Sequence, residues 1–315
     1  MLPVCNLEIR SGPQSLRRVV RRSVGLMRHA RRTGALITLL WHAVAFSGEP
    51  SDYIRYAEDA KSSRLEVAIK TFLLPTGKTV DLIGVVHIAD AAYYQELNHR
   101  FDAYDAVLFE RVGDPRALTE SAPITGGLSS LQQAAGTYLN LTFQLGAIDY
   151  RKPNMVHADA TTEEFAKMQL ERGENMVTLF ARAMQAQMGG PVNSAAMQEL
   201  DTFGLIRILM SDDSAAEFKK SLAKVFDQME AMTAAMEGKD GTVVLGGRNA
   251  LVVSKVKAVL AGRKQRRIAV FYGGAHMPGI EAALVGDMQA KPAQEEWLAA
   301  WTMPKAPLAG PPALK

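Results

Sequence analysis

Residues 79–88 read TVDLIGVVHI, an apolar run that ends in the G-x-x-H unit Gly84–His87. The run LEVAIKTFLLP (65–75) precedes it, and Pro75-Thr76-Gly77-Lys78 joins the two. Two β-rich runs with Pro and Gly between them predict a hairpin. The second run is richer in Val and Ile, so we expect it to be the inner strand.

A helix and another strand are expected directly after this hairpin. Residues 89–104 (ADAAYYQELNHRFDAY) carry apolar side chains at helical spacing, and DAVLFERV (105–112) has the pattern of a strand. Strand, helix and strand in close succession predict a β-α-β unit with a parallel pair. Farther along, NMVHAD (154–159) is a short strand candidate, and Thr161 and Glu164 have the spacing of a capping box that begins a helix.

The same pattern returns near the other end of the chain. RRIAVFYGG (266–274) predicts a strand, and it leads into a second G-x-x-H unit, Gly273–His276. The helix predicted after it has Pro278 near its first turn. Before it, GTVVLGG (241–247) leads into a helix that is expected to end at Gly262.

These elements predict the fold class α/β. We expect one domain over residues 46–290, with a mixed, largely parallel sheet that is formed by the two ends of the chain and flanked by helices. Helical sequence between about residues 160 and 240 predicts an insertion between those ends. Residues 291–315 are rich in Pro and Ala and are predicted to be a surface tail.

The predicted helical insertion is rich in methionine. Ten of the 15 methionines fall between Met155 and Met236, and Met229, Met232 and Met236 have the spacing i, i+3, i+7. An adaptable binding groove is one interpretation. A helical cap whose apolar face uses Met is the interpretation that we favour.

Basic charge is concentrated at the start of the chain. The full sequence has a net charge of +3, but residues 1–45 hold eight arginines and one acidic residue. The remainder holds 28 Lys and Arg against 32 Asp and Glu, which gives a net charge of −4. A mildly acidic body gives no electrostatic reason to expect nucleic acid as a partner.

Residues 1–45 are expected to be a signal peptide or a basic leader. The arginines are followed by GALITLLWHAVAF (34–46), in which Ala43-Val44-Ala45 has the A-x-A pattern of a cleavage site. A secretory leader predicts export to the periplasm or the outside, with transient membrane association through the leader. The alternative is a disordered basic arm before a buried helix, in a cytoplasmic protein. Cys5, the single cysteine, lies within this leader, so the remainder has no disulfide.

Polar side chains stand at the ends of several predicted strands. His87 and His276 each end such a strand, and Glu110 ends the strand that follows His87. Because the carboxyl ends of parallel strands converge on one crevice, we expect these three side chains to lie close together. Two imidazoles and a carboxylate suit a divalent metal, with Mn, Co or Zn as the candidates. Such an ion activates water and polarises a carbonyl group, which is hydrolytic chemistry.

Further polar residues are expected to support this site. Arg248 and Asn249 open a helix, and Arg248 is a candidate for holding a developing oxyanion. His157 and Asp159 end another strand candidate, and a second histidine or carboxylate could act as a base. Each has a simpler interpretation: a salt bridge for Arg248, a helix cap for Asn249, and a bond to a backbone carbonyl for His157.

Four motifs occur in a fixed order, and their sequences are GVVH (84–87), VLFER (107–111), GGRN (246–249) and GGAH (273–276). With these motifs the chain resembles the TraB/PrgY/GumN family, which includes the TIKI Wnt-inactivating proteases, over roughly residues 65–285. At greater distance it resembles the erythromycin esterases and the ChaN-like haem-binding proteins.

This resemblance implies a secreted or membrane-tethered protein with metal-dependent peptidase activity. By position in the motifs, His87, Glu110 and His276 would be the metal or catalytic residues, with Arg248 and Asn249 in support. The placement of His157 and Asp159 rests on strand ends and not on a motif.

Three functions compete on the sequence alone. The first is a metal-dependent hydrolase, foremost a peptidase, acting on a peptide or a small-molecule substrate. The second is a binding protein without chemistry, for haem or a peptide signal, because Tyr93-Tyr94 and the Met-rich helices offer ligands and apolar surface. In the third, the polar rim only satisfies buried backbone groups.

Overall fold

The structure is a computed structural model of the 315-residue chain. The residues that it describes are 53–114, 136–174, 178, 202–228, 233, 237 and 241–305. All of them belong to the unit Gly48–Lys315. The expected leader (1–45), the Met229, Met232 and Met236 series and the last ten residues lie outside the described residues.

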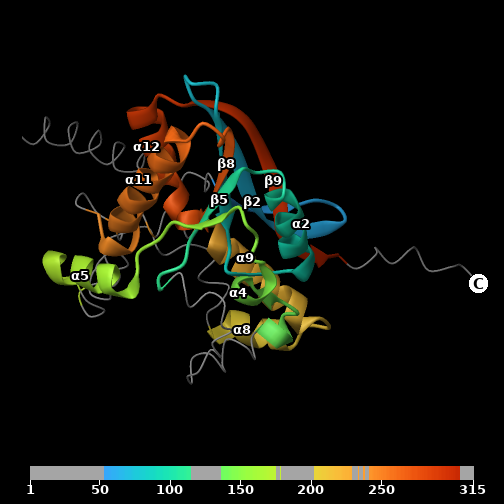
Figure 1. The fold of residues 1–315 in the computed structure, drawn as a ribbon. Helices are drawn as coiled ribbons and strands as arrows, with labels where there is room; N and C mark the ends of the chain where they lie inside the picture. Colours follow the sequence, from blue (N-terminus) through green and yellow to red (C-terminus); the bar gives the residue numbers. More distant parts are fainter. Residues whose placement is uncertain are drawn as a thin grey trace, which may run out of the picture. The chain divides into compact units, whose positions relative to one another are not determined.

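A seven-stranded mixed sheet forms the centre of the molecule (Figure 1). Its strand order is β1-β2-β3-β8-β5-β7. The strand β9 pairs with β2 along the edge of β2 that does not contact β1 and β3. The four strands β3, β8, β5 and β7 are parallel, whereas β1, β2 and β9 pair in antiparallel fashion. The strand bounds are β1 (Ile54–Glu58), β2 (Ser62–Leu73), β3 (Thr79–Val85), β5 (Ala106–Phe109), β7 (Met155–His157), β8 (Arg267–Gly273) and β9 (Lys291–Pro304). The prediction of an α/β fold with a largely parallel sheet is confirmed.

Helices cover both faces of this sheet. On one face lie α2 (Ala91–Phe101) and α9 (Ser214–Asp227), and on the other lie α11 (Arg248–Ala261) and α12 (Met277–Met288) (Figure 1). The strand β8 contributes to the cores on both faces of the sheet, because its successive side chains point to opposite faces. Ala269 and Phe271 join the core under α2, and Ile268, Val270 and Tyr272 join the core under α11 and α12.

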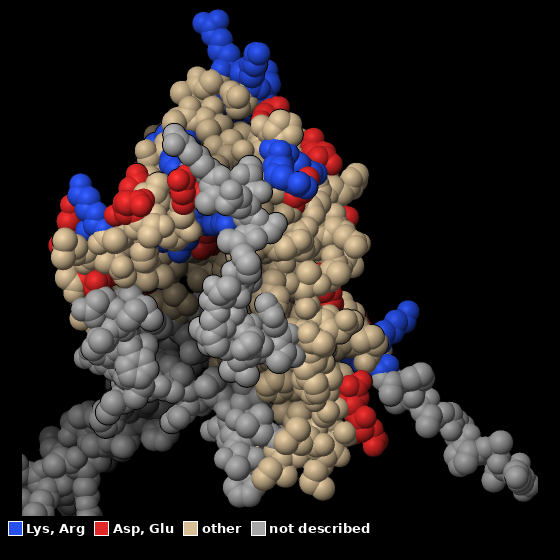
Figure 2. Space-filling view, turned by 60° about the horizontal axis from the view of Figure 1, so that its bottom comes forward, with Lys and Arg blue, Asp and Glu red and all other residues tan. Residues whose placement is uncertain are grey.

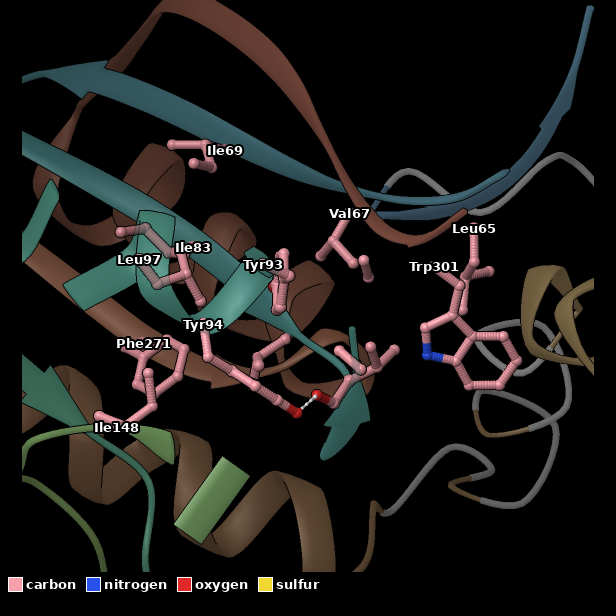
Figure 3. Close-up of a cluster of buried hydrophobic side chains, with 14 of the residues drawn as sticks. Leu65, Val67, Ile69, Ile83, Tyr93, Tyr94, Leu97, Ile148, Phe271 and Trp301 are labelled. Carbon is pink, nitrogen blue, oxygen red and sulfur yellow. Dashed lines mark hydrogen bonds between the residues drawn. The ribbon is translucent and has the colours of Figure 1, made fainter. Parts of the chain in front are cut away.

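Figure 3 shows the core on the α2 side, where Tyr93 and Tyr94 lie among aliphatic side chains. Both rings are buried, and burial raises the pKa of both phenols. The Tyr94 hydroxyl donates to the carbonyl oxygen of Val86 (2.9 Å), and the Tyr93 hydroxyl donates to that of Gly84 (3.2 Å). Both hydroxyls are bonded to backbone groups inside the core. Neither tyrosine is therefore placed as a haem ligand in this structure, and haem binding stays a prediction.

Several local predictions are confirmed. The hairpin of β2 and β3 pairs Ile69 with Ile83, and Gly77 takes the positive φ (75°) that its turn requires. The capping box begins α5 (Thr162–Arg172), with the Thr161 side chain accepting from the Glu164 backbone N–H and the Glu164 side chain accepting from the Thr161 backbone N–H. The helix α11 ends before Gly262.

Two longer-range predictions were wrong. The strands β3 and β5 are parallel but do not pair, because β8 lies between them. The stretch after Lys291, predicted to be a surface tail, instead forms the strand β9 as far as Pro304 and pairs with the whole of β2. Its sequence contains Trp297 and Trp301, and the Trp301 side chain is fully buried. The Pro and Ala content suggested a tail, but the strand becomes buried toward its C-terminal end.

Charged side chains on the described surface are mixed in sign. Figure 2 shows Lys and Arg next to Asp and Glu around the margins of one face, without a continuous basic patch. Within the described ranges, no helix is both long and apolar enough to cross a membrane.

Candidate functional site

The four parallel strands end at one edge of the sheet, and each delivers a polar side chain there. His87 lies two residues beyond β3, Glu110 directly follows β5, and Asp159 lies two residues beyond β7. The strand β8 ends at Gly273, and a short 3₁₀ turn, Gly274–His276, carries the second histidine. The expected convergence at the carboxyl ends of the strands therefore occurs in the structure.

Arg248 is the centre of a buried charge network at this edge. It is the first residue of α11 and follows a π-helical turn, Val243–Gly247, that the sequence did not predict. Its Nε donates to Asp159 Oδ1 (2.8 Å), and its Nη2 donates to Asp159 Oδ2 (2.5 Å) and to Glu110 Oε1 (2.6 Å). Its Nη1 lies 3.4 Å from the Val244 oxygen and 3.3 Å from His276 Nε2.

A guanidinium group has five N–H donors, and those of Arg248 all face protein partners. The side chain of Asp159 is fully buried, and that of Arg248 is 9 % exposed. Burial alone would lower the pKa of Arg248, but Asp159 and Glu110 raise it above its ordinary value. Arg248 therefore has no free donor for a substrate oxyanion, which was the role expected for it, and it instead holds the two carboxylates in place.

Glu110 is ionised and has a partner for each oxygen. Its Oε1 accepts from Arg248, and its Oε2 accepts from the backbone N–H of Gly273 (2.6 Å). Burial would raise the pKa of Glu110, but contact with His276 and the positive charge of Arg248 outweigh it and hold the pKa well below its ordinary value. Glu110 can therefore supply negative charge at neutral pH, but not a proton.

His276 has partners at both ring nitrogens. Its Nδ1 lies 2.7 Å from Asn249 Oδ1, and the Asn249 amide group also donates to the His276 carbonyl oxygen (3.4 Å). Its Nε2 faces Arg248 and lies 3.4 Å from Glu110 Oε1. The side chain is 5 % exposed. Asn249 thus holds His276 in position, and its supporting role in the site stays a prediction.

His87 differs because, among the residues that the structure describes, only one of its ring nitrogens has a partner. Its Nδ1 lies 2.8 Å from Gln144 Oε1, and Gln144 Nε2 donates to the Tyr150 hydroxyl (2.9 Å). This chain of bonds makes Nδ1 the donor and leaves the lone pair on Nε2. The backbone is held as well, because the Gln144 N–H donates to the His87 carbonyl oxygen (3.0 Å).

The space between His87 and Glu110 is kept open by a glycine. A Cβ atom on Gly273 would lie 3.1 Å from Glu110 Oε2 and 3.4 Å from His87 Nε2. The φ of −50° and ψ of 138° at Gly273 are accessible to any residue. Gly273 is therefore needed for space and not for backbone conformation.

His157 lies outside this centre. Its Nε2 is 2.6 Å from the carbonyl oxygen of Arg111, and its ring packs on Phe109. The simpler interpretation of His157, a bond to a backbone carbonyl, describes its place in the structure. His157 fixes the backbone of Arg111, the residue that follows Glu110.

A cleft of about 720 Å³ opens above these residues. Its polar lining comes from His87, Glu110, Arg111, Gln144 and Arg248. The Arg111 side chain is half-buried and has no hydrogen-bond or ion-pair partner among the described residues. A volume of this size is typical of small-molecule sites.

A metal ion held jointly by His87, His276 and Glu110 does not fit this arrangement. Arg248, which carries a permanent positive charge, faces both His276 Nε2 and Glu110 Oε1, where a cation would need their lone pairs. The described residues contain no group of three His, Cys, Asp or Glu side chains in position to hold an ion. Of the three side chains, only that of His87 keeps a ring nitrogen without a partner among the described residues. Use of Mn, Co or Zn stays a prediction.

Sequence reasoning missed Gln144, which orients His87. It lies 57 residues away in LNLTFQLGAI, where no motif marks it. A two-stranded sheet of β4 (Ile88–Ala89) and β6 (Thr142–Phe143) brings it there by pairing Ile88 with Phe143. Asn140 and Thr142 are polar residues of the same stretch, so nothing in the sequence singles out Gln144.

Comparison with known proteins gives no match: neither models of protein families nor curated proteins match this sequence. The resemblance to the TraB/PrgY/GumN family therefore stays a prediction that rests on the four motifs.

Proposed function

We propose that the protein is a hydrolase of esters or amides in which His87 acts as the general base. The observation that carries the proposal is that His87 lines the cleft and that its Nε2 has no partner among the described residues, while Gln144 fixes the opposite nitrogen. A histidine with one nitrogen anchored and the other free has the arrangement of a catalytic base.

The chemistry follows from the charges around this nitrogen. A water molecule bonded to His87 Nε2 gives up a proton to it as the water oxygen attacks a substrate carbonyl carbon. The resulting imidazolium is stabilised by the ionised Glu110, whose own pKa is lowered in part by His87. The proton then passes from His87 to the leaving alcohol or amine, which restores the neutral ring.

Arg111 is the residue that we assign to the developing oxyanion. It lines the same cleft as His87 and has no partner among the described side chains, whereas the donors of Arg248 are in use. A fixed cation at a developing negative charge is among the strongest contributions to catalysis. His157 supports this role by holding the Arg111 carbonyl group.

A binding protein without chemistry is the second candidate, and the size of the cleft favours it. A binding protein would take up the same ligands in the cleft as the hydrolase, but it would not convert them to products. A peptidase, the foremost expectation from the sequence, is the amide-hydrolysing form of the first proposal.

The test is turnover of p-nitrophenyl acetate and of a mixed peptide substrate by the full chain, with and without a chelator. We expect His87→Ala to lower kcat/KM by about 10²–10⁴-fold, while His99→Ala, at an exposed position on α2, leaves it unchanged. Activity lost on chelation and restored by Mn, Co or Zn would establish the metal-dependent form. No turnover of either substrate under any of these conditions would overturn the hydrolase proposal in favour of binding alone.

A further inference from the structure

The cleft has a polar end and a long apolar wall. Beyond His87, Glu110, Arg111, Gln144 and Arg248, every lining side chain in the described part of the chain is apolar. These apolar residues are Ile88, Val112, Leu139, Leu141, Phe143, Leu145, Leu222, Phe226 and Trp301. The polar groups are thus confined to the ends of β3 and β5 and the helix termini beside them.

Besides Ile88 and Val112, three separate segments build this wall. Leu139, Leu141, Phe143 and Leu145 come from the segment that leads through β6 into α4 (Gln144–Ala147), and all four line the cleft. Leu222 and Phe226 are four residues apart on α9 and so share one face of that helix. Trp301 comes from β9, and its ring centroid lies 5.2 Å from that of Phe226.

Ionic and backbone contacts fix the position of the wall. Lys219 of α9 donates to Asp90 Oδ1 (2.6 Å), and Asp90 Oδ2 accepts from the Thr302 backbone N–H (2.7 Å). The Trp301 indole N–H donates to the Ile88 carbonyl oxygen (2.7 Å). The Trp301 side chain therefore links the apolar wall to the segment that carries His87. This link fixes the position of the wall relative to His87.

We infer that the substrate is an ester or amide of an apolar acyl group, with its carbonyl at His87 and its hydrocarbon chain along the wall. This inference deepens the proposed function and rests on it for the chemistry, though not for binding. Beyond the polar end, the described residues of the wall present no polar side chain to a peptide backbone, which needs hydrogen-bond partners along its length. A hydrocarbon chain needs none, and each buried methylene adds to binding.

The first experiment is a chain-length series of p-nitrophenyl esters, from acetate through butyrate and octanoate to dodecanoate, with the full chain. Burial of a methylene group predicts that kcat/KM rises about fourfold per added CH₂ until the wall is filled. A flat or falling series in an enzyme that hydrolyses the acetate would overturn the inference and leave the proposed function standing.

A matched pair of variants locates the effect. Leu145 is 51 % exposed on α4 (Gln144–Ala147) and lines the cleft, whereas Leu209 is 72 % exposed on α8 (Thr202–Leu209) and does not. Leu145→Asp is expected to lower the ratio of dodecanoate to acetate turnover at least tenfold. Leu209→Asp is expected to leave the ratio unchanged. An equal effect of the two variants would contradict the assignment of the wall.

A binding measurement separates the two proposals. Dodecanoate is titrated into the full-length His87→Ala variant, and tryptophan fluorescence is followed, with Trp301→Phe to assign the signal. One outcome is saturable binding of dodecanoate that Leu145→Asp weakens, together with no ester cleavage by the wild type. This outcome would sustain the apolar-ligand site and overturn the hydrolase proposal. Failure of dodecanoate to bind would overturn the acyl site whatever the activity.

Discussion

His87 and His276 end matching G-x-x-H units on neighbouring parallel strands, yet the structure places them in opposite environments. His276 is buried with both ring nitrogens engaged, whereas His87 is exposed and its Nε2 has no partner in the described part of the chain. The backbone explains the difference. After β8 the chain turns at once into Gly274–His276 and folds the ring under the rim, whereas after β3 it continues past His87 into the short strand β4. A shared motif therefore specifies a shared location but not a shared role.

The site has a buried half, which is the network of Arg248, Asp159, Glu110 and His276, and an open half, which is His87 and Arg111 at the cleft. The largest expected effect tests whether the buried half serves to hold the fold together. Arg248→Met leaves Asp159 and Glu110 buried without their counter-charge, and we expect a loss of about 3–5 kcal/mol in the free energy of unfolding. Urea denaturation measures it. The control is Arg55→Met, because Arg55 pairs with Glu66 from a side chain that is 41 % exposed and should cost at most about 1 kcal/mol. Equal losses would contradict the contrast between a buried network and a surface pair.

The second prediction concerns the open half of the site. Arg111→Gln is expected to lower kcat/KM about a hundredfold while leaving the midpoint of urea unfolding unchanged, because its side chain has no described partner to lose. Arg151→Gln, at a side chain that is 78 % exposed and outside the cleft, serves as the matched control for loss of positive charge. A stability loss in Arg111→Gln without loss of turnover would assign Arg111 to the structural half.

A third prediction tests the gap between the two halves. Gly273→Ala places a methyl group between Glu110 Oε2 and His87 Nε2, and displacements of this size can cost about 10²-fold in rate. The backbone tolerates alanine there, so circular dichroism should show an intact fold. Gly286→Ala, in α12 with open space around the new Cβ, should leave turnover unchanged and raise stability by about 0.5–1 kcal/mol. Full activity in Gly273→Ala would mean that turnover does not need the space between Glu110 and His87.

The smallest effect is a pH dependence of stability. The pKa of Glu110 is lowered by folding, so its ionised form stabilises the folded state above the ordinary value of 4.5, and this stabilisation is lost as the pH falls below it. Glu110→Gln cannot lose a charge. The difference in the free energy of unfolding between wild type and Glu110→Gln should therefore shrink between pH 5 and pH 3, as measured by urea titrations at fixed ionic strength. A gap that stays constant would place the carboxylate in an unperturbed environment.

The sequence revealed those features that depend on neighbouring residues. The β2–β3 hairpin, the capping box at Thr161 and the end of α11 at Gly262 each follow from residues within one turn or one strand pair. The convergence of His87, Glu110 and His276 was also predictable, because parallel strands end at one edge.

The features that were missed depend on pairings between distant segments. Gln144 reaches His87 through β4 and β6, and β8 enters between β3 and β5 from the far end of the chain. Which ring nitrogen of each histidine remains free follows from those pairings. No spacing of residues within a motif carries that information, so the roles of the two histidines could not be told apart from sequence.

The strand β9 also has a consequence for the order in which the molecule assembles. It pairs with the whole of β2, but residues 74–290 separate the two strands in the chain. A ribosome therefore releases β2 long before β9, and throughout that interval the edge of β2 offers unpaired amide and carbonyl groups to other chains. Chaperone capture or strand exchange between nascent chains is most to be expected at this edge. Trp301 belongs to both β9 and the cleft wall, so the wall is complete only after β9 has paired with β2.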